Sequence, residues 1–166
     1  MRYLKLIKSV IKINDKFYDL KFTLDVIDKI QDITELPITQ IVARTMEKAT
    51  RKSAVQILLK YLVGQEIEDN DNEFGYYSAV LLNTYIDQLK TKPIPEQKKV
   101  ENVENEYDFF DIERMVYIGT TVLGYQEQDV WEMTPGKIGT LHNQHLRYND
   151  RIFIEKEVSI DEAIPM

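Results

Sequence analysis

Ile13-Asn-Asp-Lys-Phe-Tyr-Asp-Leu-Lys-Phe22, which runs straight into Thr23-Leu24, determines the class of fold that this chain adopts. Residues 4–13 and 17–22 both alternate roughly between apolar and polar side chains, and the polar cluster Asn14-Asp15-Lys16 lies between them. Two such runs around a short polar turn predict a β-hairpin. A lone hairpin is barely stable in water, so its apolar face needs a cover.

Helices are predicted to supply that cover. Thr23 is a plausible N-cap, and Asp25 in the first turn faces the positive end of the helix dipole. Apolar residues at helical spacing predict four helices: one from Thr23 to Leu36-Pro37, one capped by Thr39, one from about Ala54 to Gly64, and one from about Glu73 to Lys90. Residues 1–90 are therefore predicted to form an α+β domain, mainly α, with the hairpin packed on a helical bundle.

The last of these helices carries a broad apolar stripe formed by Phe74, Tyr77, Leu81, Tyr85 and Leu89. A stripe of this kind is usually core. If the hairpin and the earlier helices do not cover the whole stripe, the uncovered part becomes a surface for subunit contact or for a protein partner. Both interpretations stay open at the level of sequence.

The amino-acid composition of the chain changes after this helix. Residues 91–106 contain two prolines, a lysine pair and repeated Glu-Asn, which predicts an extended linker. Residues 107–150 return to a helical pattern and are predicted to form a small C-terminal helical module. Residues 151–166 form an acidic tail in which residues 152–154 could add a short strand or docking segment.

Tyr117 to Ile138 is the most distinctive part of the C-terminal module. It holds the only tryptophan, Trp131, between a helix that ends near Gly124 and a new helix that opens at Thr134-Pro135. It is typical of an aromatic-anchored docking unit. If Trp131 is instead the core anchor of a three-helix unit, its exposed neighbours would contact the partner. The predicted partner-binding residues of the module are Tyr117, Leu123, Tyr125, Gln128, Trp131, Glu132, Met133 and Ile138.

Composition excludes several classes of protein. The 166 residues contain no cysteine, and no apolar run approaches the roughly 20 residues that span a bilayer. The serines lie in no nucleophile-elbow setting, and carboxylate pairs are uninformative in an acidic chain. His142 and His145 lie three residues apart, but a metal site needs further ligands. We therefore expect no enzymatic activity, no metal, no cofactor and no membrane partner.

The net charge of −7 is unevenly distributed along the chain. Residues 1–63 carry 12 lysines and arginines against 7 aspartates and glutamates, whereas residues 64–166 carry 9 against 21. The last predicted helix offers Lys137, Asn143, Gln144 and Arg147, and its surroundings resemble a helix-turn-helix. A small nucleic-acid-binding regulator is thus the alternative function, although the acidic half disfavours contact with a phosphate backbone.

Two parts of the chain resemble the tail assembly chaperones of long-tailed bacteriophages. In the C-terminal module the resemblance lies in Val122-Leu123-Gly124, Glu127-Gln-Asp129, Trp131 and Met133-Thr134-Pro135. At the N-terminus it lies in the hairpin Ile13 to Phe22 that feeds a helix at Thr23-Leu24. The resemblance covers about half of the chain, and the glycines of the last helix and the long tail depart from it.

The resemblance implies a chaperone whose N-terminal domain self-associates and keeps the tape measure protein soluble. The C-terminal module would recruit tail tube subunits, and the chaperone would act in the host bacterial cytoplasm and be absent from the mature virion. In many members the two-module form arises from a ribosomal frameshift within the linker, where Lys98-Lys99 lies here. The expected partners are therefore the tape measure protein, the tail tube protein and further copies of this chain.

Overall fold

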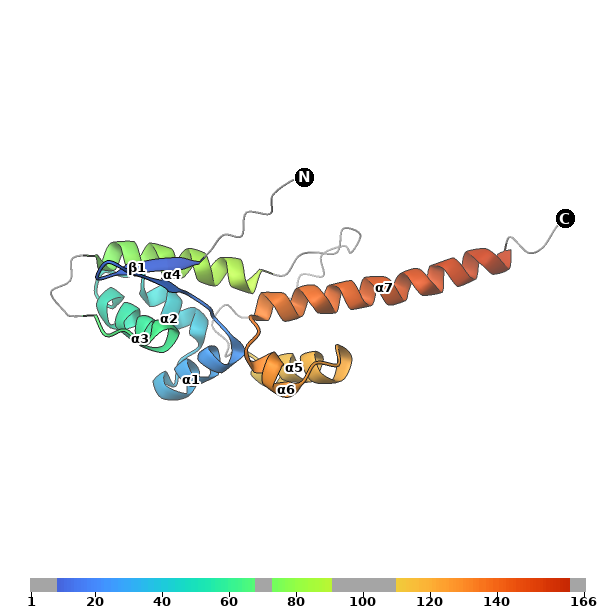
Figure 1. Ribbon diagram of the computed structural model, residues 1–166, viewed down its shortest axis with the longest axis horizontal. Coiled ribbons are helices and arrows are strands. Elements are labelled where there is room, and N and C mark those ends of the chain that lie inside the picture. Colours follow the sequence, from blue (N-terminus) through green and yellow to red (C-terminus); the bar gives the residue numbers. More distant parts are fainter. Residues whose placement is uncertain (1–8, 68–72, 91–109, 162–166) are drawn as a thin grey trace.

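A computed structural model describes residues 9–67, 73–90 and 110–161 of the chain. The predicted linker at 91–106, the first part of the predicted hairpin and the end of the tail lie outside these residues. The described part is mainly helical and begins with a two-stranded antiparallel hairpin, as the sequence predicts (Figure 1). Its elements are β1 (Val10–Ile13), β2 (Lys16–Asp19), α1 (Leu24–Thr34), α2 (Ile38–Arg44), α3 (Arg51–Val63), α4 (Phe74–Leu89), α5 (Ile112–Tyr117), the π-helix η1 (Ile118–Val122), α6 (Glu127–Trp131) and α7 (Pro135–Asp161).

The hairpin is closed by a two-residue turn. Asn14 and Asp15 have φ values of 46° and 63°, in the left-handed region that these two residue types tolerate better than most. The turn pairs Ile13 with Lys16 and Ile11 with Tyr18, so Ile11 and Ile13 lie on one face of the hairpin. Both isoleucines are fully buried, and the helices supply the cover that the hairpin requires.

A single hydrophobic cluster connects the hairpin with α1 to α4. Gln88 on α4 links the two layers, because its side-chain amide donates to the Leu20 carbonyl (2.8 Å) and accepts from the Phe22 N–H (2.7 Å). Ser78 ties α4 to the end of α2 through a 2.7 Å hydrogen bond to the Thr45 carbonyl. Leu20 and Phe22 follow the end of β2, so the amide of Gln88 supplies the hydrogen bonds that a neighbouring strand would otherwise make to their backbone groups.

The C-terminal helices share this cluster. Ile112, Val130, Met133 and Ile138 are buried together with core residues of α1 to α4. The buried side-chain oxygen of Gln31 on α1 accepts from the backbone N–H of Ile38 (3.2 Å) and of Phe110 (3.0 Å). The helices on either side of the predicted linker therefore pack against each other, although the linker itself is not described.

Gly136 brings α7 against the end of α4. A Cβ atom at this position would lie 2.7 Å from the Lys90 carbonyl oxygen and closer still to that of Gln88. Only glycine permits this approach of one backbone to another. The first turn of α7 is thereby fixed, and the rest of the helix extends away from the body of the molecule (Figure 1).

Two local predictions are wrong. Thr39 does not cap α2, because the helix begins one residue earlier with Pro37 at the cap position, and the Thr39 hydroxyl is buried without a hydrogen-bond partner among the described residues. Residues 152–154 do not form a strand but belong to α7, which continues to Asp161. No glycine or proline occurs between Gly139 and Pro165, so nothing in the sequence interrupts this helix.

Candidate protein-binding groove

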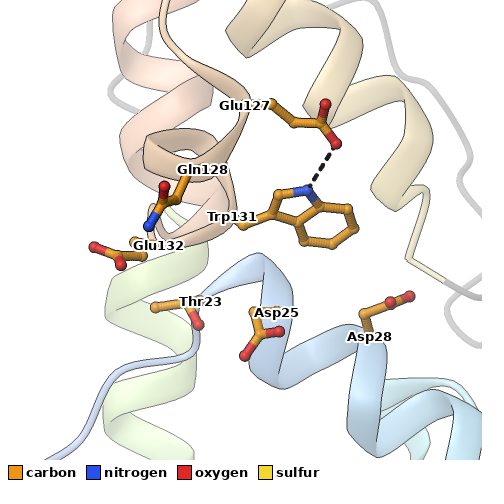
Figure 2. Close-up of a pocket in the computed structure, with 7 residues that line it drawn as sticks. All are labelled: Thr23, Asp25, Asp28, Glu127, Gln128, Trp131 and Glu132. Carbon is orange, nitrogen blue, oxygen red and sulfur yellow. Dashed lines mark hydrogen bonds between the residues drawn. The ribbon is translucent and has the colours of Figure 1, made fainter.

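Two adjoining hollows meet at Trp131. The first, of about 700 Å³, lies between the N-terminal half of α1 and one face of α6, and is lined by Thr23, Asp25, Asp28, Glu127, Gln128, Trp131 and Glu132 (Figure 2). The second, of about 500 Å³, lies between α1 and α5 and is lined by Asp28, Ile112, Glu113, Val116, Tyr117, Thr120 and Trp131. Because Asp28 and Trp131 line both, we treat the two hollows as one surface and call it the Trp131 groove.

Backbone contacts fix the walls of the Trp131 groove relative to each other. The Leu24 N–H at the start of α1 donates to the Met133 carbonyl, which follows α6, at 3.0 Å. This bond satisfies one of the backbone donors that every helix N-terminus leaves free. On the other side of α6, a Cβ atom on Gly119 would lie 2.6 Å from Val130 Cγ1. The glycine in the π-helix thus lets Val130 bury completely and holds α6 close to η1.

Trp131 is partly buried, with its polar atom exposed to the groove. The ring packs against the hydrophobic cluster, and its Nε1–H donates to Glu127 Oε1 at 3.2 Å. Figure 2 shows the indole between Glu127 above it and Asp25 and Asp28 of α1 below it. Trp131 therefore anchors α6 to the core and also lines the groove, and its role in docking a partner stays a prediction.

The groove is strongly acidic. Five carboxylates line it, those of Asp25, Asp28, Glu113, Glu127 and Glu132, and no lysine or arginine does in the part of the chain that the structure describes. Asp25 is paired with Lys29 outside the lining, at 2.7 Å. Asp28 has no basic partner within the described residues, and its burial together with the nearby Asp32 and Asp25 carboxylates raises its pKa.

The predicted residues of the C-terminal module are divided between this surface and the core. Tyr117, Gln128, Trp131 and Glu132 line the groove, as described above. Tyr125 is exposed but lines neither hollow, and Leu123 is half-buried. Met133 and Ile138 are buried in the hydrophobic cluster, where they hold α6 and α7 in place.

The apolar stripe of α4 lies almost entirely inside the chain. Phe74, Tyr77, Leu81 and Tyr85 are buried, and Leu89 is half-buried against the same cluster. Tyr85 packs edge-on against Phe22 with ring centroids 5.3 Å apart, and burial raises the pKa of its hydroxyl to about 12. In this structure α4 packs against β1, α2, α3 and α7, so the buried part of its stripe presents no free surface for a partner.

The α1 side of the groove was missed by the sequence prediction. The sequence pattern explains Asp25 by the helix dipole and predicts no role for Asp28. The available signal was the spacing of Asp25, Asp28 and Asp32, which places three carboxylates on one side of an amphipathic helix. That this side meets Trp131 depends on long-range packing.

Other kinds of site are not indicated in the part of the chain that the structure describes. No group of three or more histidine, aspartate or glutamate side chains is arranged to hold a metal ion there. None of the helices described combines the length and apolar character needed to cross a bilayer. The polar residues considered for nucleic-acid contact, Lys137, Asn143, Gln144 and Arg147, all lie on α7.

Comparisons of the chain with protein-family models, with curated proteins and with solved structures gave no match.

Proposed function

We propose that this chain is a tail assembly chaperone of a long-tailed bacteriophage. It binds the tape measure protein before the tail tube closes around it, and it recruits tail tube subunits. It acts by mass action without chemistry, as many copies of modest affinity shield an apolar partner and are later displaced. On this proposal it self-associates, works in the cytoplasm of the host and is absent from the finished virion.

The observation that carries the proposal is the Trp131 groove. It lies in the stretch that resembles the chaperone family, and it exposes an aromatic residue and polar side chains on helices fixed to a rigid core. Aromatic residues surrounded by polar groups are typical of protein-binding hot spots. The groove is accessible in the single chain, unlike the α4 stripe, so we assign partner recruitment to it.

Capture of partners by the full chain tests this function. The tagged chain is mixed with tape measure and tail tube proteins from the same phage genome, and bound protein is quantified. We expect both to be captured. Tyr117→Ala should weaken capture of the tube protein about tenfold, because the side chain is 59% exposed at the groove and its loss removes an aromatic contact.

Tyr148→Ala is the matched control, because Tyr148 is 69% exposed but lies on α7 and lines neither hollow of the groove. It should leave capture of both proteins unchanged. Failure of the unmodified chain to capture either protein would refute the proposed function. Equal effects of the two tyrosine substitutions would show that the Trp131 groove does not recruit the tube protein.

A further inference from the structure

We propose that the Trp131 groove binds a segment of its protein partner that presents an arginine or lysine beside an apolar residue, with the cation seated between Trp131 and the carboxylates of α1. This inference rests on the proposed function in that the occupant is a protein. It adds the chemistry by which the occupant is recognised.

Charge complementarity identifies the occupant. The five carboxylates that line the groove come from three separate helices, and among the described residues no basic side chain lines it to neutralise them. Lys29 is engaged with Asp25 at one edge, which leaves Asp28 at the centre without a partner among the described residues. A cationic side chain from outside would supply the missing counter-charge.

The apolar part of the groove selects a protein side chain over a simple ion. The indole of Trp131 lies beside Asp28, and Ile112, Val116 and Tyr117 continue the lining toward α5. An aromatic ring next to carboxylates accommodates a guanidinium or ammonium group by a cation–π contact together with an ion pair. The neighbouring apolar lining accommodates the stem of that side chain and an adjacent apolar residue.

The electrostatic environment of Asp28 supports the same conclusion. Asp25 and Asp32 on its own helix act on Asp28, which shares the lining of the groove with Glu113 on α5 and with Glu127 and Glu132 on α6. Burial and the carboxylates of α1 already raise the pKa of Asp28, so its charged form is disfavoured in the free chain. A bound cation would relieve this repulsion, and the relief would contribute favourably to the free energy of binding.

Calorimetric titration of the full chain tests the inference with a defined probe. The probe is a blocked, tryptophan-free peptide, Ala-Arg-Leu-Arg-Ala, and the comparison peptide has both arginines replaced by citrulline. We expect the arginine peptide to bind more tightly by at least tenfold, to weaken with added salt, and to change the emission of Trp131, the only tryptophan of the chain.

Asp28→Lys should weaken binding of the arginine peptide at least tenfold. The matched control is Asp19→Lys, which makes the same change of net charge at an exposed position on β2, outside the groove. Asp28→Asn, which removes the charge without adding a new one, should give a smaller loss. Equal binding of the two peptides, or equal loss in Asp28→Lys and Asp19→Lys, would overturn the inference.

Three further outcomes are informative: one tests the kind of ligand, and two separate this inference from the proposed function. If Ca²⁺ alone produces the Trp131 response and displaces the peptide, the groove is a cation site and the inference is wrong. If the chain captures its tube protein with equal strength in the unmodified form and in Asp28→Lys, the proposed function stands and the inference fails. If the arginine peptide binds at Asp28 but neither phage protein is captured, the inference stands and the function fails.

Discussion

At the scale of single residues, Asp28 lowers the stability of the folded chain at the place where we propose that a partner binds. It lies between Asp25 and Asp32 on α1, three and four residues away, where like charges destabilise a helix by about 0.2–0.5 kcal/mol per pair. No lysine or arginine among the described residues pairs with it. A residue that disfavours the folded state and lies at the centre of an exposed groove is typical of a binding site.

Asp28→Asn is therefore expected to stabilise the folded chain at neutral pH, by about 0.5 kcal/mol. The pKa of Asp28 is raised in the folded state, so the folded state binds more protons than the unfolded state near that pKa. The unfavourable effect of Asp28 on stability therefore grows as pH rises and vanishes in acid. Urea unfolding at pH 7 and pH 3 should show the gain at pH 7 alone. A loss of stability at pH 7 would contradict this account.

At the scale of elements, the junction between α4 and α7 depends on Gly136. The backbone of α7 touches the last carbonyls of α4, so the junction is made by main-chain atoms that cannot move aside as a side chain would. From this junction α7 projects away from the body (Figure 1). Met133, which precedes this junction, is held separately, because its carbonyl accepts from the Leu24 N–H at the start of α1.

Gly136→Ala should destabilise the chain by about 1–3 kcal/mol, the range typical of overpacking. Gly75→Ala is the matched control on α4, because a Cβ atom there meets nothing within 4 Å and alanine favours a helix by up to about 1 kcal/mol. Thermal unfolding followed by circular dichroism should show opposite shifts for the two variants. A neutral Gly136→Ala would mean that α7 does not rest on α4.

At the scale of the whole molecule, helices from both predicted modules contribute to one hydrophobic cluster. A C-terminal module of this size is too small to bury much of its own surface. Here it gains burial by packing Ile112, Val130, Met133 and Ile138 against the N-terminal helices. The groove exists because of this packing, since one wall comes from α1 and the other from α5 and α6.

The full chain should therefore unfold in one cooperative transition. Emission of Trp131 reports the C-terminal helices, whereas far-ultraviolet circular dichroism is dominated by the helices of the whole chain. We expect the two signals to change at the same urea concentration, as in two-state unfolding. An earlier transition of Trp131 would show that the C-terminal helices separate from the core as an independent unit.

Local patterns in the sequence correctly identified most elements. Alternation around Asn14-Asp15 predicted the hairpin, apolar periodicity predicted α1 and α3, and Gly64 and Pro135 marked helix ends that the structure contains. These signals are readable because each is confined to a few neighbouring residues. The error at residues 152–154 arose where a short apolar run fits a strand or a helix equally well.

The sequence by itself thus determined the mainly α, α+β class, the hairpin and the acidic character of the C-terminal half. Only the tertiary structure decided that the α4 stripe is core and that α1 faces Trp131. Both depend on which residues meet across the chain, as when Leu24 bonds to Met133 and Phe110 bonds to Gln31. Such contacts follow from the joint burial of many apolar side chains, a property that no single stretch of sequence contains.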